Sequence, residues 1–290
     1  MIESVAIVGM GLMGGSLGLA LRARGVAVAV RGYARRDAAR QQALAGGFVD
    51  TVYDSASAAV AGADLVVLCT PVLTMPALVR EIRDTLKPGC IVTDVGSTKQ
   101  WLDGELQSAL AGSGAVYVGS HPMAGSEKVG MDASRADLYE RACVMVTPGD
   151  TLPEVDAGAE LRRFWEAVGA EVTLITPEAH DRLVARTSHL PHLMASLLVE
   201  AVNRDGDWVL GFCGPGFRDT TRIAAGSEDV WHDIVKSNAT AIRDELDVLR
   251  AGIDGLCGLI DTGDFEAVRG LLADSRRKRE AFRNHGQQGE

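Results

Sequence analysis

The chain opens with a glycine-rich turn between two kinds of local pattern. Ser4–Val8 is apolar and β-prone, and Gly9-Met10-Gly11-Leu12-Met13-Gly14 follows it directly. Ser16–Arg24 then has helical apolar spacing and stops at Gly25, and Val26–Tyr33 is again β-prone. A Gly-x-Gly-x-x-Gly turn in this strand–helix–strand context is typical of a dinucleotide-binding domain, whereas a lone match also fits a turn without a ligand.

The residues of this turn have different predicted tasks. Gly9 permits a tight turn, Gly11 lets the backbone approach a pyrophosphate, and Gly14 permits close packing of helix on strand. Leu12 and Met13 contribute free N–H groups at the helix N-terminus, where the positive end of the helix dipole faces the phosphates.

The end of the second predicted strand bears on the choice between NAD and NADP. Ala34 stands where an NAD-selective site usually has an acid for the ribose hydroxyl. Arg35 and Arg36 follow, and arginine can pair with a 2′-phosphate, so we favour NADP. Asp37 keeps NAD open, and the two arginines also fit a solvated basic turn.

The alternation continues, which predicts an α/β fold with a doubly wound, Rossmann-type sheet. The expected strands are Asp64–Cys69, Cys90–Val95, Val116–Gly119, Cys143–Thr147 and Glu171–Ile175, with a helix over Glu154–Val168. Ligands of such sheets bind beyond the carboxyl ends of the strands. Thr70-Pro71, Ser97 and His121 each come just after a predicted strand, so we expect them to share one crevice with the cofactor.

His121 is the candidate general base. It precedes Pro122 and a run of small residues that ends at Gly130, and histidine titrates close to neutral pH. A proton acceptor in a chain with a dinucleotide turn suggests a dehydrogenase. Ser97 can orient this histidine, and Ser97 or Thr98 can equally cap a helix that begins near Lys99.

After Thr176-Pro177 the pattern becomes helical, over Pro177–Ala201, Val230–Leu249 and Phe265–Phe282. We therefore expect a dinucleotide-binding domain over residues 1–176 and an all-α substrate and dimerisation domain over residues 177–290. By analogy with other two-domain dinucleotide enzymes, the helical domain pairs in a homodimer. The Ser188–His192 segment interrupts the first helical pattern.

Polar side chains of the helical part suit a small anion better than a metal. His189 and His192 lie one helical turn apart, but no acidic third ligand occurs at helical spacing, so we expect no metal. Arg218 and Arg222 suit a dicarboxylate, or they form a surface salt-bridge cluster with Asp219.

Composition excludes some classes of partner. The formal net charge of −10 argues against nucleic acid and against an anionic membrane as the main partner. The five cysteines are scattered, which is typical of reduced thiols and predicts a cytoplasmic location. No apolar run is long enough to span a membrane.

With these residues assembled, the chain resembles the prephenate/arogenate (cyclohexadienyl) dehydrogenase family. The matching pieces, in the family's order, are Gly9–Gly14, Asp94–Lys99, His121–Gly130, His180-Asp181, Ser188–His192, and Gly216–Ala224 with Trp231. The resemblance implies a dinucleotide domain followed by a helical dimerisation domain. It also implies an oxidative decarboxylation in tyrosine biosynthesis, in which prephenate becomes 4-hydroxyphenylpyruvate.

The resemblance assigns roles to individual residues. His121 accepts the hydroxyl proton and Ser97 orients it. Arg222, helped by Arg218, binds a substrate carboxylate. The remaining residues that it places at or near the site, some of them across the dimer, are Glu127, His192, Asp219 and Trp231.

Several alternatives stay open. His192 after Leu190-Pro191 resembles prephenate-using members and favours prephenate, while arogenate, dual specificity and 4-amino-4-deoxyprephenate remain alternatives. A β-hydroxyacid dehydrogenase usually has a lysine base on the interdomain helix, and the region around His189 has none. A nucleotide-sensing module would keep the glycine turn but would not need His121, Ser97 and Arg222 together.

Overall fold

The computed structural model describes residues 2–124, 130–148 and 157–286, with side chains up to residue 281. The chain forms two compact units, Met1–Ile242 and Arg243–Glu290. This division differs in position from the domain boundary at residues 176–177, which stays a prediction about where the dinucleotide-binding part ends.

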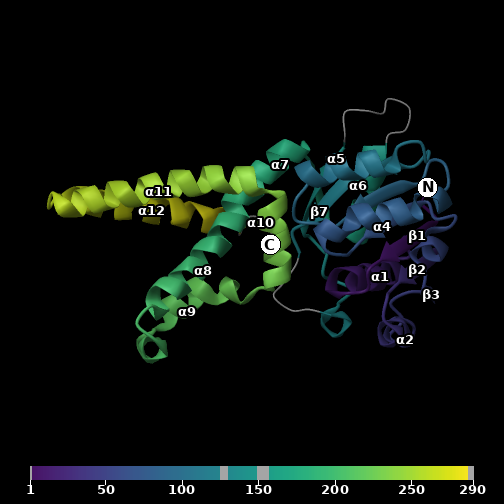
Figure 1. The fold of residues 1–290 in the computed structure, drawn as a ribbon, viewed down its shortest axis with the longest axis horizontal. Coiled ribbons are helices and arrows are strands. Elements are labelled where there is room, and N and C mark those ends of the chain that lie inside the picture. Colours follow the sequence, from purple (N-terminus) through teal and green to yellow (C-terminus); the bar gives the residue numbers. More distant parts are fainter. Residues whose placement is uncertain (1, 125–129, 149–156, 287–290) are drawn as a thin grey trace. The chain divides into compact units, whose positions relative to one another are not determined.

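The first unit contains a six-stranded parallel sheet with the order β3-β2-β1-β4-β5-β6 (Figure 1). Its strands are β1 (Ser4–Val8), β2 (Ala29–Tyr33), β3 (Thr51–Tyr53), β4 (Leu65–Leu68), β5 (Ile91–Asp94) and β6 (Val116–Tyr117). The strand order reverses between β1 and β4, and a crevice for a ligand forms at such a point in open α/β sheets. The predicted Rossmann-type sheet is confirmed.

Helices cover both faces of this sheet. Side chains alternate between the two faces along each strand, so the apolar strands present side chains that must be buried on both sides. Val5 and Ile7 of β1 pack in one core with Leu17 and Trp165, and Ala6 and Val8 pack in the other. The helices of this part are α1 (Leu12–Arg24), α2 (Asp37–Ala45), α3 (Ala56–Val60), η1 (Val72–Thr74), α4 (Met75–Ile82), η2 (Arg83–Thr85), α5 (Gln100–Leu110), η3 (Met131–Ala133) and α6 (Ala157–Val168).

A second sheet departs from the predicted single sheet. Its strands, in the order β7-β8-β9, are β7 (Gly119–Pro122), β8 (Cys143–Thr147) and β9 (Glu171–Leu174). β7 pairs antiparallel with β8, so His121 lies inside a strand, opposite Met145, and not in a loop after a strand as expected. Ser120 explains the position of β7, because its hydroxyl bonds to Thr93 Oγ1 at 2.9 Å and to the Asp94 carbonyl at 2.6 Å. These bonds hold His121 beside the carboxyl end of β5.

The helical part of the first unit begins where the sequence predicts. Thr176 accepts a hydrogen bond from the Ala179 N–H group and Pro177 takes the first helical position, both typical of a helix start. The helices are α7 (Pro177–Val184), the π-helical turn η4 (Ala185–His189), α8 (Leu190–Asn203), η5 (Asp207–Phe212), α9 (Pro215–Thr221), η6 (Arg222–Ala225) and α10 (Glu228–Ser237).

The predicted interruption at Ser188–His192 takes the form of the π turn. The Leu190 N–H group donates to the Ala185 carbonyl, five residues back. Pro191 follows directly and has no N–H group to donate to Thr187, so a regular helical ladder cannot continue there. The helix therefore runs through this point with one widened turn.

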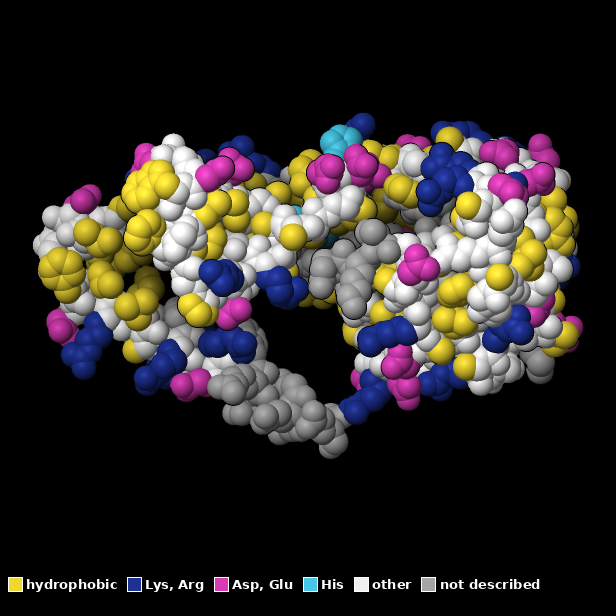
Figure 2. All heavy atoms as spheres, turned by 90° about the horizontal axis from the view of Figure 1, so that it is seen from below, with side chains coloured by type: hydrophobic (Ala, Val, Ile, Leu, Met, Phe, Trp, Pro, Cys, Tyr) yellow, Lys and Arg dark blue, Asp and Glu magenta, His cyan; other side chains and the backbone are white. Residues whose placement is uncertain are grey.

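The second unit consists of helical chain after Ile242. Its elements are most of α11 (Ala239–Asp261) and α12 (Phe265–Gly286), joined at Gly263, whose φ of +70° suits glycine. Large apolar side chains on both helices are exposed, and Figure 2 shows hydrophobic side chains in yellow among charged ones. Within the described residues, none of the helices combines the length and the apolar character that a membrane span requires.

Candidate active site

The glycine turn has the geometry of a phosphate cradle. Gly9 has a φ of +109°, and a Cβ there would lie 2.6 Å from the Cys69 carbonyl oxygen. A Cβ at Gly14 would lie 2.1 Å from the Gly9 carbonyl oxygen, whereas a Cβ at Gly11 would meet nothing within 4 Å. Helix α1 begins directly after Gly11 without a side-chain cap, so its first N–H groups face the open space beside Gly11.

Thr70 at the end of β4 lies over this turn. Its Cγ2 atom is 3.0 Å from the position of a Gly9 Cβ, and its Oγ1 atom is buried without a hydrogen-bond partner among the described residues. Pro71 beside it is exposed and caps η1. A buried hydroxyl that lacks a partner next to an open phosphate cradle fits a bound dinucleotide, because buried polar groups are normally hydrogen-bonded.

The chain after β2 carries two cations, at the position where the sequence predicts the ribose end of the cofactor. Ala34 is buried, and the side chains of Arg35 and Arg36 are exposed. Asp37 opens α2 and pairs with Arg40 at 3.1 Å, and Arg40 also donates to the Ala34 carbonyl at 3.0 Å. Asp37 is therefore already engaged by a neighbouring cation.

A chain of three side chains connects β7 to α7. His121 is 7% exposed, and its Nδ1 atom lies 2.9 Å from Nε2 of His180. His180 is fully buried, and its Nδ1 atom lies 2.8 Å from Oδ1 of Asp181. The two imidazole rings meet edge to face, with an interplanar angle of 63°.

This chain determines where the ring protons are. A carboxylate only accepts, so His180 carries its proton on Nδ1 and its Nε2 atom is an acceptor. His121 must then donate from Nδ1, which leaves its Nε2 atom with a lone pair. The arrangement prepares His121 to accept a proton at Nε2, as a general base does.

The protonation state agrees with this role. Burial lowers the pKa of His121 well below its ordinary value of 6.5, and the nearby His180 and Lys99 lower it further. Burial also lowers the pKa of His180, although the hydrogen bond to Asp181 opposes that shift. Both rings are therefore neutral at neutral pH, and Asp181 can stabilise the positive charge that appears when His121 takes a proton.

Asp181 has a second task as the cap of α5. Its carboxylate accepts from the Lys99 N–H group at 2.7 Å and from the Gln100 N–H group at 2.9 Å. The alternative in which Ser97 or Thr98 caps this helix is wrong: no side chain of the N-cap residue bonds there, and Thr98 Oγ1 instead pairs with Ser237 Oγ at 2.8 Å. A distant carboxylate is the better cap because it brings a full negative charge to the helix N-terminus.

Ser97 lies in the loop between β5 and α5, and a buried ion pair holds that loop. Lys99 Nζ lies 2.6 Å from Asp94 Oδ1 and donates to the Gly96 carbonyl at 2.7 Å, and both charged side chains are fully buried. The Tyr117 hydroxyl donates to the other Asp94 oxygen at 2.7 Å, and burial together with Asp94 raises the pKa of that phenol well above 10. Ser97 is half-buried here, and its role as orienter stays a prediction, because His180 provides the contact at Nδ1 of His121.

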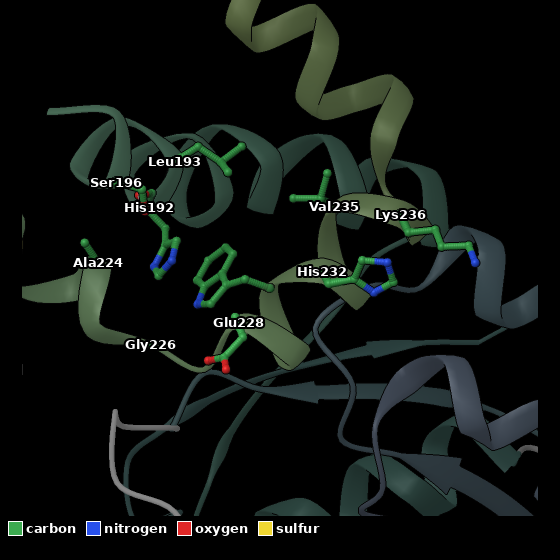
Figure 3. Close-up of a pocket in the computed structure, with 10 residues that line it drawn as sticks. His192, Leu193, Ser196, Ala224, Gly226, Glu228, His232, Val235 and Lys236 are labelled. Carbon is green, nitrogen blue, oxygen red and sulfur yellow. The ribbon is translucent and has the colours of Figure 1, made fainter. Parts of the chain in front are cut away.

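A cavity of about 520 Å³ lies between α8 and α10 (Figure 3). The imidazole of His192 stacks on the indole of Trp231, with ring centroids 3.5 Å apart and an interplanar angle of 12°. Gly226 faces this stack, since a Cβ there would lie 2.7 Å from Trp231 Nε1. The other residues that line the cavity are Leu193, Ser196, Ala224, Glu228, His232, Val235 and Lys236.

The remaining predicted substrate residues lie near the end of α9. Arg218 and Asp219 are in this helix, Arg222 opens η6, and all three are exposed. Glu127 lies outside the described residues. The part of the chain that the structure describes contains no group of three or more side chains that could hold a metal ion.

Comparison with known proteins identifies the family. Residues 17–174 match the family model described as prephenate dehydrogenase, nucleotide-binding domain. Residues 176–274 match the model described as prephenate dehydrogenase, dimerization domain. The chain belongs to the prephenate dehydrogenase family. The resemblance read from the sequence motifs is thereby confirmed, and so is the prediction of an enzyme.

Members of the prephenate dehydrogenase family resemble this chain over most of its length. The cyclohexadienyl dehydrogenase of Zymomonas mobilis is 34% identical over 285 residues, which are 97% of this chain and 96% of the relative. The prephenate dehydrogenase of Bacillus subtilis is 32% identical over 92% of this chain and 72% of its own length. The crystal structure of prephenate dehydrogenase from A. aeolicus in complex with hydroxyphenyl propionate and NAD+ has a TM-score of 0.90, with 30% identity, over 97% of this chain and 99% of that one.

Sequence patterns alone assign no role to His180, Asp181 or Asn238 in this prephenate dehydrogenase family member. The adjacent His-Asp pair just after the helix start at Pro177 is the signal that could have pointed to an oriented imidazole. Nothing local indicates that the partner is His121, because 59 residues separate the two histidines.

Proposed function

We propose that this enzyme catalyses the NAD(P)-dependent oxidative decarboxylation of prephenate to 4-hydroxyphenylpyruvate, in tyrosine biosynthesis. One observation carries the proposal. The hydrogen-bonded chain Asp181–His180–His121 leaves Nε2 of His121 as a neutral proton acceptor. Membership of the prephenate dehydrogenase family supplies the substrate class.

The protein's part in the reaction is to move one proton and hold the substrate. The nicotinamide, when bound, supplies the hydride acceptor for the carbon that bears the hydroxyl group. His121 Nε2 takes the hydroxyl proton as that carbon is oxidised, and His180 with Asp181 stabilises the imidazolium. The ring then loses carbon dioxide and becomes aromatic, and His121 returns the proton to the phenolate oxygen. Arg222 and Arg218 bind a carboxylate of the substrate.

A spectrophotometric assay that crosses NAD and NADP with prephenate and arogenate tests this proposal. We expect reduction of the cofactor with prephenate, and we expect His121→Asn to lower kcat by about 10²- to 10⁴-fold, as for a lost acid–base group. Cofactor affinity of the variant, measured by fluorescence titration, should stay within about twofold of the parent, because His121 is assigned to proton transfer and not to cofactor binding. Full turnover by His121→Asn would remove the base from the mechanism.

We infer a preference for NADP from the end of β2. Arg35 and Arg36 are exposed there, and Asp37 is paired with Arg40. We expect Arg35→Ala and Arg36→Ala each to lower kcat/KM for NADP by about 10- to 100-fold, the range for a lost charge-assisted hydrogen bond, with little change for NAD. Arg162→Ala on α6, another exposed arginine, is the matched control. Equal losses for both cofactors would contradict the preference.

The same assay decides the alternative substrate. A relative at 34% identity is named cyclohexadienyl dehydrogenase, so arogenate or dual specificity stays compatible with the family. His192, stacked on Trp231 at the cavity, favours prephenate in our proposal. A kcat/KM for arogenate above that for prephenate would reverse this choice.

We further propose a homodimer that works in the cytoplasm. Pairing of two copies is supported by the match to the dimerization domain model. It is also supported by exposed apolar side chains on the helical elements, among them Phe212 and Leu272. The cytoplasmic location rests on the cysteine pattern, and all five cysteines are free thiols.

A further inference from the structure

His189 occupies a buried position within electrostatic reach of the proposed base. It is the last residue of the π turn η4, and 1% of its surface is exposed. Its ring meets Trp231 edge to face, with centroids 6.0 Å apart, and it contributes to the electrostatic environment of His121. The mechanism described above does not use this side chain.

The tautomer of His189 follows from its neighbour Asn238. The Asn238 amide nitrogen donates to the Asp181 backbone carbonyl at 2.9 Å, and this contact requires the nitrogen and not the amide oxygen on that side. The same nitrogen lies 3.2 Å from Nδ1 of His189. Because an amide nitrogen only donates, Nδ1 must accept, and the ring proton of the neutral histidine is on Nε2.

The Nε2–H group of His189 has no hydrogen-bond partner among the described residues, although it is buried. Such a donor is costly and uncommon in a folded protein. Burial lowers the pKa of His189 to about 4, so the ring is neutral at neutral pH and carries a single N–H donor, on Nε2.

We propose that His189 Nε2–H donates a hydrogen bond to an oxygen of the bound substrate, so that it is a further substrate-positioning residue. The two histidines then have opposite roles: His121 presents an acceptor and His189 presents a donor. Both tautomers depend on Asp181, through its carboxylate for His121 and through its backbone carbonyl and Asn238 for His189. The inference rests on the proposed function, because it assigns the acceptor to that reaction's substrate.

Two variants distinguish the role of the Nδ1 acceptor of His189 from that of its Nε2–H donor. In His189→Asn the side-chain amide can replace Nδ1 and accept from Asn238, but it does not reach the position of Nε2. In His189→Gln the amide nitrogen reaches the position of Nε2 and keeps a donor there. The probe is 4-hydroxyphenylpropionate, added to enzyme saturated with NAD+ and followed by calorimetry.

We expect His189→Asn to weaken binding of the probe by about fivefold or more, the effect of one lost hydrogen bond, and His189→Gln to retain most of the affinity. The affinity for NAD+ alone should be the same in both variants and the parent. Equal probe affinity in His189→Asn and the parent, or a loss confined to NAD+, would overturn the inference while leaving the proposed function intact. A parent enzyme that binds neither the probe nor prephenate would overturn both.

A spectroscopic measurement tests the tautomer directly. In enzyme labelled with ¹⁵N-histidine, we expect the His189 ring, assigned through His189→Gln, to show the Nε2–H pattern, and its Nε2 resonance to shift when the probe binds. An Nδ1–H pattern, or an unchanged resonance under saturation, would also overturn the inference.

Discussion

At the scale of single residues, the interior of this enzyme keeps histidines neutral at a mildly acidic pH at which the unfolded chain would hold them charged. Burial lowers the pKa values of His121, His180 and His189 below 6.5. Below pH 6.5 the unfolded chain binds protons that the folded enzyme does not, so stability must fall as the pH falls. The hydrogen-bonded chain that prepares the base therefore makes the fold sensitive to acid.

For His189, the change in the free energy of unfolding with pH can be calculated. Between pH 6.5 and its folded pKa of about 4, this residue should remove about 1.4 kcal/mol of unfolding free energy per pH unit. Urea unfolding at fixed protein concentration, repeated from pH 7.5 to 5, measures the slope. We expect His189→Gln to have a shallower slope than the parent, since glutamine does not titrate. Parallel slopes would mean that this histidine does not stay neutral in the fold.

At the scale of elements, one carboxylate joins helix α7 to helix α5. Asp181 bonds to the first N–H groups of α5 and to His180 within its own helix. Helix position and ring orientation thus depend on the same side chain. A change at Asp181 must affect stability and catalysis together, unlike a change at an exposed acid.

We expect Asp181→Asn to lower the free energy of unfolding by about 1–3 kcal/mol, because the amide loses the negative charge and an acceptor at the α5 N-terminus. It should also lower kcat, because His180 loses the acceptor that places its proton on Nδ1. Glu178→Gln on the same helix is the control, since this acid is 66% exposed and its 3.7 Å ion pair with Arg182 contributes little. Thermal unfolding and steady-state kinetics report the two effects; similar results for both variants would contradict them.

Sequence patterns predict those elements of the fold that are determined by residues close together in the chain. The bounds of β1 and β8 agree with the expected strands, and Gly25 ends α1 in the left-handed conformation, because apolar runs and glycine stops are local signals. His121 is recognisable from the sequence as a candidate base, and that role stays a prediction. Its strand, the second sheet and the Asp181 cap are not recognisable, because the bond from Lys99 to Asp181 spans 82 residues and leaves no periodic trace.

At the scale of the whole molecule, exposed apolar side chains lie on elements that match the dimerization model. Phe212 is 80% exposed and Leu272 62% exposed, both within residues 176–274. Val28, outside that range, lies in the bend just before β2 and is 83% exposed. Large exposed apolar side chains that gather on a few elements mark an interaction surface, whereas single ones are ordinary.

We expect the parent enzyme to have twice the mass of one chain in light scattering coupled to size-exclusion chromatography. Phe212→Asp and Leu272→Asp should shift it towards the mass of one chain, because a charge at a self-complementary interface is buried twice. Val28→Asp serves as the control and should leave the mass unchanged. A parent enzyme of single-chain mass would contradict the proposed pairing.

The π turn at Ala185–His189 holds one residue more than an ordinary helical path. Deleting one residue there would rotate α8 by about 100° about its axis relative to α7. Because bonds from Ser237 to Thr98 and from Asn238 to Asp181 hold the end of α10 to the preceding chain, His192 would turn away from the indole it now covers. The length of this segment, more than its composition, thus preserves the site. In an alignment of related chains, we expect a one-residue gap at this turn to accompany a change in the substrate that the enzyme binds.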